Sequence, residues 1–299
     1  MTTGQFLETI AKLSGVAFVV SSMLAMGLNL TVPMIVHPLR RWVLVVSALV
    51  VNFVVVPLLA IGIAEALSLD QTLRDGLLIV GLAAGAPFLP KLAQGAGGDV
   101  AFAVGFMVVL MVATVIVLPV ALPWLLDGVS VSASSIATSL VVLMLVPLAI
   151  ALAVRARWPE SAAEYQPVLA KTSTVAVIVL LVVGLGLNVE NVLDLVGTRG
   201  LLAIALLVVA SVAVGIAVGG RDPSTRVVVA LGTGQRNLSA AMVVATQNFA
   251  GTETLTFVLV ASVVLLLILL PSAGLVGRVC GTGSTTTGEP AAHPGPDTR

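Results

Sequence analysis

Nine apolar stretches, each about twenty residues long, constrain the fold of this chain more than any other feature of its sequence. They lie approximately at 10–32, 43–66, 75–93, 100–124, 135–154, 172–190, 200–219, 226–247 and 254–277. A helix needs about 20 apolar residues to cross a hydrocarbon core of roughly 30 Å. Only 9% of the residues are charged, whereas a soluble domain has about 25%. The sequence therefore predicts an all-α polytopic membrane protein with nine transmembrane helices in residues 1–277.

Lysine and arginine are unequally divided between the two sides of the predicted membrane. Ten lie on one side, namely Arg40, Arg41, Lys91, Arg155, Arg157, Lys171, Arg221, Arg226, Arg278 and Arg299. Three lie on the other, namely Lys12, Arg74 and Arg199. Because basic loops stay in the cytoplasm, we expect a multi-pass protein of the cell membrane with its N-terminus outside and its C-terminus inside. Residues 278–299 are rich in Gly, Ser, Thr and Pro, which predicts a disordered cytoplasmic tail.

The eighth apolar stretch is interrupted by the hexapeptide Gly232-Thr233-Gly234-Gln235-Arg236-Asn237. Its two glycines, Gly232 and Gly234, loosen a helix, since each costs roughly 1 kcal/mol relative to alanine. Its polar residues place donors and a positive charge at bilayer depth, where a charge costs roughly 3 kcal/mol. Because many secondary transporters bind substrate at a broken helix near the midplane, we predict four substrate ligands here: Thr233, Gln235, Arg236 and Asn237. The alternative is that Arg236 forms a structural tie or reaches an interface.

The third apolar stretch is also interrupted, over residues 81–91. Pro87 and Pro90 follow Gly85, and each proline removes a backbone donor and clashes with the preceding turn. The carbonyl groups that lose their helical partners are tolerated beside a cavity or beside another broken segment. We therefore predict a second break at Gly85, Pro87 and Pro90, with Pro87 and Phe88 facing the substrate. A simple proline kink is the alternative.

An internal repeat relates the two interruptions. A shift of 152 residues, without gaps, aligns Asp70–Arg74 with Asp222–Arg226 and residues 81–90 with 233–242. The arginines that end the first pair of segments fall on opposite sides of the predicted membrane, so the two units are inverted. Inverted repeats with paired broken helices are typical of transporters that work by alternating access.

Three motifs follow one another along the chain: Met26-Gly-Leu-Asn-Leu30, the Gly85-to-Gly95 segment with Gly98-Asp-Val-Ala after it, and Gly234-Gln-Arg-Asn237. Together they resemble the bile acid:sodium symporter family, over roughly residues 10–277. The resemblance implies two broken helices that cross in a core domain, residues 43–124 and 200–277. It also implies a panel domain of spans 10–32, 135–154 and 172–190. It further implies a secondary transporter of an organic anion.

The chain departs from the family's pattern where members with sodium coupling hold their ions. Those members carry glutamate, glutamine, Ser-Asn and two hydroxyl residues at the positions of Gly232, Arg236, Ala86-Pro87, Ala103 and Met107. Sodium is a hard cation and needs several oxygen ligands, most of which are replaced here. Asn237 and the backbone near Gly232 remain as candidate ion ligands.

Arg236 offers a physical replacement for bound sodium, because a guanidinium supplies permanent positive charge and planar donors that suit a carboxylate. We therefore expect a carrier of a small organic anion that works without the usual sodium sites, either coupled to H+ or as a uniporter. The alternative is an ordinary sodium symporter with unrecognised Na+ ligands. We expect no organic cofactor and no structural metal, and oligomeric state is not predicted.

Other classes of function find little support in the sequence. An intramembrane enzyme is the main rival, but the chain has no Gly-x-Ser-x-Gly motif and no histidine within a span. Zero net charge argues against nucleic acid as a partner, which leaves the substrate and the lipid bilayer. Asp99 is expected to cap the fourth span. Asn52 and the segment Asn29–Thr31 either line a cavity or hydrogen-bond locally within a helix.

Overall fold

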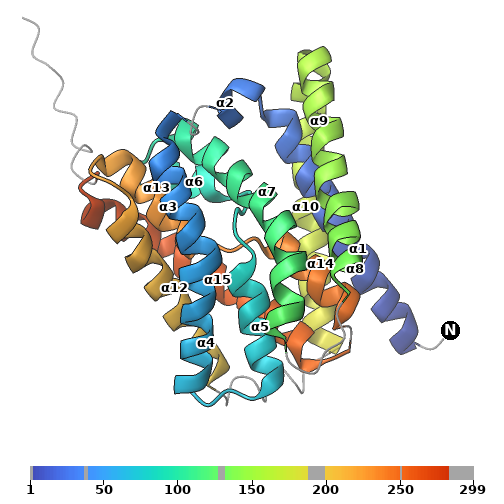
Figure 1. Ribbon diagram of the computed structural model, residues 1–299. Coiled ribbons are helices and arrows are strands. Elements are labelled where there is room, and N and C mark those ends of the chain that lie inside the picture. Colours follow the sequence, from blue (N-terminus) through green and yellow to red (C-terminus); the bar gives the residue numbers. More distant parts are fainter. Residues whose placement is uncertain (1–2, 37–39, 127–131, 188–198, 250, 283–299) are drawn as a thin grey trace, which may run out of the picture.

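The fold was analysed in a computed structural model that describes residues 3–36, 40–126, 132–187, 199–249 and 251–282 (Figure 1). Within these residues the chain is helical and contains no strand. Its elements are α1 (Thr3–Asn29), α2 (Val32–Val36), α3 (Trp42–Val50), η2 (Val51–Val55), α4 (Val56–Ala66), α5 (Gln71–Leu82), α6 (Leu89–Gly95), α7 (Val100–Leu125), α8 (Ala133–Leu140), η3 (Val141–Leu145), α9 (Val146–Arg157), α10 (Pro159–Leu187), α12 (Gly200–Val218), α13 (Pro223–Gly234), α14 (Leu238–Asn248) and α15 (Glu253–Cys280). Of these, η2 and η3 are π-helical turns within longer helices.

Eight helical segments are long and apolar enough to cross a membrane. They are Thr9–Asn29, Trp42–Ala66, Val100–Leu125, Ala133–Arg157, Pro159–Leu187, Gly200–Val218, Pro223–Asn248 and Glu253–Cys280. The remaining predicted span, 75–93, is not among them because it is divided between α5 and α6, and each of these helices is too short to cross a bilayer alone. The chain is thus a helical, multi-pass membrane protein.

Several predicted boundaries differ from the observed helices. The first span was expected at 10–32, but α1 runs from Thr3 to Asn29. The sixth span was expected at 172–190, but α10 begins at Pro159, because residues 159–171 form a more polar first half of the same helix. The junction of α9 and α10 accordingly projects beyond the other helices at the top of Figure 1. The tail was expected from residue 278, but α15 continues to Cys280 and ends at Gly281, whose φ of 91° suits glycine. Residues 283–299 of the predicted tail lie outside the described part of the chain.

The helices pack in two groups. In the first, α1 lies along α10 and against α9, and these are among the most extensive contacts in the molecule. In the second, α12 packs on α13, while α5 packs on α15 and α4. Figure 1 shows the first group on the right and the second on the left and centre. The broken segments lie in the second group.

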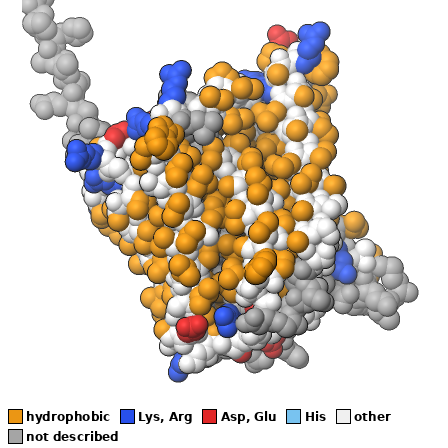
Figure 2. All heavy atoms as spheres, viewed as in Figure 1, with side chains coloured by type: hydrophobic (Ala, Val, Ile, Leu, Met, Phe, Trp, Pro, Cys, Tyr) orange, Lys and Arg blue, Asp and Glu red, His pale blue; other side chains and the backbone are white. Residues whose placement is uncertain are grey.

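The outer surface is apolar across the middle of the molecule (Figure 2). Lys, Arg, Asp and Glu gather near the upper and lower edges of that face. Large side chains such as Leu267 and Val182 are about two thirds exposed, at 68% and 67%. A soluble monomer rarely exposes such a continuous apolar surface, whereas a lipid bilayer covers it. The surface therefore agrees with the membrane placement of the helices.

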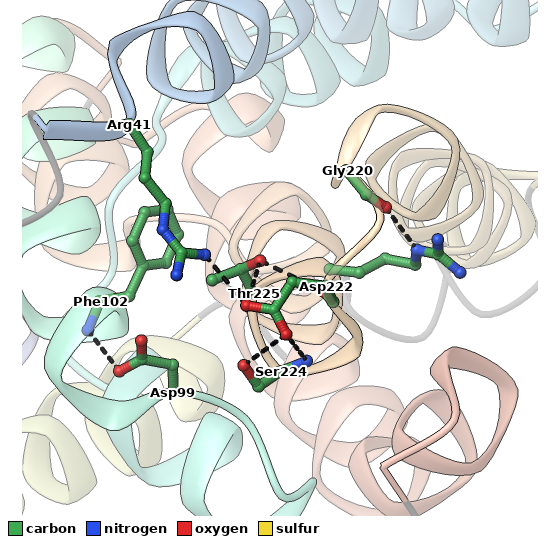
Figure 3. Close-up of polar contacts among 8 residues, drawn as sticks. Arg41, Asp99, Phe102, Gly220, Asp222, Ser224 and Thr225 are labelled. Carbon is green, nitrogen blue, oxygen red and sulfur yellow. Dashed lines mark hydrogen bonds and ion pairs between the residues drawn. The ribbon is translucent and has the colours of Figure 1, made fainter.

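Helix starts are tied together at one end of the second group (Figure 3). Asp99 caps α7 by accepting a hydrogen bond from the Phe102 amide at 2.9 Å, which confirms the predicted cap. The Asp99 amide donates to the Ser224 carbonyl oxygen at 3.1 Å. Asp222 caps α13 and accepts a hydrogen bond from Arg41 Nη1 at 3.0 Å. The start of α3 is thereby joined to the starts of α7 and α13.

We expect substitution of Asp222 by asparagine to lower stability modestly and in a pH-dependent way. Partial burial by itself raises the pKa of this carboxyl, but hydrogen bonds from Arg41, Ser224 and Thr225 outweigh it and bring the pKa below its usual value. A lowered folded pKa stabilises the protein above the unfolded pKa of about 3.9, and that contribution is lost as pH falls through the lower folded value. Both partners of the ion pair are nearly half exposed, at 45% and 44%, so the pair is worth less than about 1 kcal/mol.

The measurement is the thermal midpoint of purified protein between neutral and acidic pH. The difference between wild type and Asp222→Asn should be present at neutral pH and should shrink as the wild-type carboxyl becomes protonated. A difference that stays constant across this range would show that the charge of Asp222 contributes nothing.

Candidate functional site

Two helices are interrupted in the middle of the second group. The first interruption covers residues 83–88, between the end of α5 at Leu82 and the start of α6 at Leu89. The second covers residues 235–237, between α13 and α14. Gly85 and Pro87 lie within the first interruption, whereas Pro90 lies in the first turn of α6. Gly232 and Gly234 form the last turn of α13.

The two interrupted segments hydrogen-bond directly to each other. The backbone N–H of Asn237 donates to the Ala83 carbonyl oxygen at 2.7 Å, and its side-chain Nδ2 donates to the Gly85 carbonyl oxygen at 3.0 Å. The same side chain caps α14, because its Oδ1 accepts from the Ala240 amide at 3.1 Å. Arg236 Nη1 donates to the Gly81 carbonyl oxygen at 3.0 Å. Three carbonyls at the first break, those of Gly81, Ala83 and Gly85, thus accept hydrogen bonds from the second.

Thr114, in the middle of α7, completes the first break. Its Oγ1 lies 2.9 Å from both the amide nitrogen and the carbonyl oxygen of Ala84, so one hydroxyl accepts from the first and donates to the second. The side chain is fully buried. We missed this residue in the sequence, where its only signal is a lone hydroxyl in a strongly apolar helix.

Gly85 lets the first break approach α7 closely. Its φ is 79°, in the left-handed region that side chains disfavour. A β-carbon at this position would lie 2.7 Å from the Met107 carbonyl oxygen and would also collide with the Met111 amide nitrogen. Glycine is therefore required here both by backbone conformation and by space.

Arg236 is buried and only partly hydrogen-bonded. Its side chain is 1% exposed, and Nη1 makes the bond to Gly81. Nε and Nη2, which share one edge of the guanidinium plane, have no hydrogen-bond partner among the described residues. Gln235 Oε1 is also buried and has no hydrogen-bond partner among the described residues. Unpaired buried donors of this kind are costly, which makes Arg236 a candidate for ligand binding.

Gln235 and Arg236 both line a cavity of about 250 Å³. The other polar lining residues are Ser22 and Ser239, and the rest of the wall is apolar. Apolar residues from α1, α6, α10, α14, α15 and the first break form it: Phe18, Ala86, Pro87, Phe88, Leu92, Val177, Leu238, Leu265, Leu266, Leu269 and Leu270. The predicted ligands Pro87 and Phe88 are therefore brought together with Arg236 and Gln235. Asn237 lies beside them but is used in joining the two breaks.

Thr233 is not brought to this cavity. It is fully buried and accepts a hydrogen bond from Asn52 Nδ2 at 3.3 Å. Asn52 lies in the π-helical turn η2 and also donates to the Ala48 carbonyl oxygen at 2.9 Å. Asn52 thus makes the local helix bond that its sequence context allows and, in addition, a contact with α13. Asn29 lines a second cavity, described below.

The surroundings of Gly232 are apolar and tightly packed. A β-carbon there would lie 2.9 Å from Phe106 Cε1 and 3.0 Å from Leu89 Cδ2. Phe106 stacks on Phe102, with ring centroids 5.5 Å apart. Ala103 and Met107, on the same helix, are buried as well. Gly232, Ala103 and Met107 carry no side-chain oxygen, and a side chain at 232 would require Phe106 and Leu89 to shift.

Comparison with known proteins gives one family. A model described as the Sodium Bile acid symporter family matches residues 16–195, which is more than half of the chain. The match includes the first break and α7 but ends before the second break. A search among curated proteins found no match.

Proposed function

The chain belongs to the sodium bile acid symporter family, and from this we propose that it carries a small organic anion across the cell membrane by alternating access. The family is one of transporters, so a small-molecule substrate and a membrane setting follow from membership. The observation that supports an anion as the substrate is that Arg236 lines a largely apolar cavity while its buried Nε and Nη2 lack hydrogen-bond partners among the described residues.

The geometry of Arg236 favours a carboxylate. Nε and Nη2 donate in parallel from one edge of the guanidinium, and paired parallel donors match the two oxygens of a carboxylate. Because Nη1 is held by the Gly81 carbonyl, the free edge is fixed in orientation. The apolar wall formed by α1 and α15 would contact the hydrocarbon part of such a substrate.

Two inverted units account for the arrangement of the breaks. A shift of 152 residues places the bounds of α5, Gln71–Leu82, on those of α13, Pro223–Gly234. Asp70 and Asp222 are the N-caps of these two helices, and they accept hydrogen bonds from the Leu73 and Ser224 amides respectively. The Thr72 carbonyl accepts a hydrogen bond from the start of α15, as the Ser224 carbonyl does from the start of α7. The correspondence supports the repeat that the sequence predicts.

The alternating-access proposal assigns the helices to two domains. The panel comprises α1, α8 with α9, and α10, and the core comprises α3 to α7 and α12 to α15. In this scheme α5 and α6 together form the ninth span, the N-terminus is outside, and the C-terminus is cytoplasmic. The cavity at Arg236 is lined from both groups, by α1 and α10 on one side and by α14 and α15 on the other, which supports a substrate site between them.

The rival within the family is ordinary sodium symport. The packing of Phe106 and Leu89 around Gly232 argues against a sodium ion where sodium-coupled members carry glutamate. We propose instead that the positive charge beside the substrate is that of Arg236, with proton coupling or uniport as the mode of transport. Intramembrane catalysis is the rival from another class, and no observation of the site favours it.

Uptake into sealed vesicles tests this proposal. Purified protein is reconstituted, and uptake of organic anions is measured with sodium and with choline as the external cation, each at two pH gradients. We expect saturable uptake whose rate is the same in both cations. Uptake that requires sodium would contradict the proposal. It would favour the alternative, a sodium symporter with ion ligands at other positions.

A further inference from the structure

A second cavity adjoins the one at Arg236. It has a volume of about 420 Å³ and lies between α1 and α10 on one side and the first break, α6 and α7 on the other. The two cavities share three lining residues, Ser22, Pro87 and Phe88. They therefore meet at the first break, with the ring of Phe88 at the junction.

The second cavity is more polar than the first, and its polar lining residues come from three helices. They are Ser22 and Asn29 of α1, Lys91 of α6, and Gln166 and Ser173 of α10. Lys91 is the charged residue of the set, and its ammonium lies 5.7 Å from the centroid of the Phe88 ring. This contact with the ring face holds the charge near the junction of the cavities.

We propose that Lys91, together with the amide groups of Asn29 and Gln166, forms an anion-binding subsite on the predicted cytoplasmic side. It is called the outer subsite because it is more exposed to water than Arg236, and it binds the carboxylate of the substrate as the substrate passes between Arg236 and that side of the membrane. The inference rests on the proposed function. It extends that function to residues that have no role in the site at the two breaks. Its ligand is the anionic group of the same organic anion, bound while still partly hydrated.

The chemistry of the two sites differs in the way that a two-step path requires. Lys91 is exposed, so its ammonium stays in contact with water, whereas Arg236 is 1% exposed. A hydrated point charge on a flexible stem attracts an anion without fixing its orientation. The amides of Asn29 and Gln166 supply neutral donors at the same mouth. An anion can thus lose its hydration in steps before it meets the rigid guanidinium.

The test compares Lys91→Gln with Lys91→Arg and with Lys171→Gln. Lys171 is the control, because it is also exposed but lines a different hollow between α1 and α10. Uptake of benzoate, phenylacetate and cholate is measured in vesicles of phosphatidylcholine alone, so that anionic lipid headgroups cannot account for an effect of Lys91.

We expect Lys91→Gln to raise KM by roughly three- to tenfold with little change in kcat, since the lost attraction is that of one exposed charge. The effect should diminish as salt rises from roughly 0.05 to 0.5 M, because added ions screen exposed charges. Lys91→Arg should retain nearly wild-type KM, and Lys171→Gln should be unchanged.

The outcomes distinguish the outer subsite at Lys91 from the proposed substrate-binding role of Arg236. Equal behaviour of Lys91→Gln and Lys171→Gln, or a fall in kcat at unchanged KM, would overturn the outer subsite and leave Lys91 as an interfacial residue. A raised KM in Lys91→Gln beside undiminished uptake in Arg236→Gln would keep the outer subsite and overturn the role of Arg236. Absence of uptake of every probe by the wild-type protein would overturn both.

Discussion

Replacement of Arg236 by glutamine is expected to reduce organic anion uptake by roughly 10- to 100-fold, because hydrogen bonds to a charged group are worth about 1.5–3 kcal/mol. The substitution removes the guanidinium of a cavity-lining residue, whose buried Nε and Nη2 have no hydrogen-bond partner among the described residues. Glutamine retains one amide donor but neither the charge nor the paired geometry. The loss should therefore be larger for anions than for neutral compounds of the same shape.

The same substitution is expected to leave the folded protein at least as stable as the wild type. Among the described residues Arg236 makes one side-chain hydrogen bond, to the Gly81 carbonyl, and its buried Nε and Nη2 have no partner. A buried charge without full pairing costs stability, so its removal relieves that cost. Opposite changes in uptake and stability are the signature of a residue kept for function.

Uptake and the thermal midpoint of the purified protein are measured for Arg236→Gln, Arg236→Lys and Arg199→Gln. Arg199 is a matched control, because its Nη1 also donates to a carbonyl, that of Leu67, at 2.9 Å, but at an exposed site away from the cavity. Arg236→Lys keeps the charge without the planar fork and should fall between the others in uptake. Undiminished uptake with a lowered midpoint in Arg236→Gln would identify Arg236 as a structural tie instead.

Gly85→Ala is expected to destabilise the protein by roughly 2–4 kcal/mol. The left-handed φ of 79° costs about 1 kcal/mol for alanine, and overpacking against a rigid backbone adds roughly 1–3 kcal/mol. The new methyl group would press on the backbone of α7 near Met107 and Met111. The first break would have to move away from α7, and the hydrogen bonds of Ala84 with Thr114 would be lost.

Stability is measured as the thermal midpoint, and folded yield as the fraction of monodisperse protein after detergent extraction. Gly62→Ala is the control, because Gly62 lies within α4 and a β-carbon there meets nothing within 4 Å. Alanine at that position should be neutral or stabilising, since it favours the helix. Equal midpoints for the two variants would mean that the close approach at Gly85 contributes little to stability.

The position of the two breaks was accessible from sequence because local chemistry determines it. Glycine, proline and polar residues within an apolar run conflict with a continuous membrane helix, and the chain is interrupted near them, at 83–88 and 235–237. Asp99 was recognisable as a cap because that role depends on the next three residues alone. Pro90 was less informative, since a proline is accepted in the first turn of a helix, where α6 places it.

The contacts that hold the breaks together were not accessible, because they depend on which distant segments meet. Thr114 lies 30 residues from Ala84 and carries no local sign of its bonds to it. Thr233 was expected at the substrate, but whether it faces the cavity or Asn52 is decided by the rotation of α13 against α3 and η2. The extent of α10 was underestimated because a hydropathy pattern marks the apolar part of a helix, and this helix begins with the more polar residues 159–171.

The joining of the two breaks also bears on how the protein is synthesised. Asn237 follows Gly85 by 152 residues, and a ribosome adds roughly 5–20 residues per second, so the first break waits on the order of ten seconds or more for its partner. Thr114 emerges much sooner and can bind Ala84 at once. During the delay, the carbonyls of Gly81, Ala83 and Gly85 need water, lipid headgroups or the insertion machinery as temporary partners. The first half of the chain is therefore inserted as an unfinished structure, and the second half completes it.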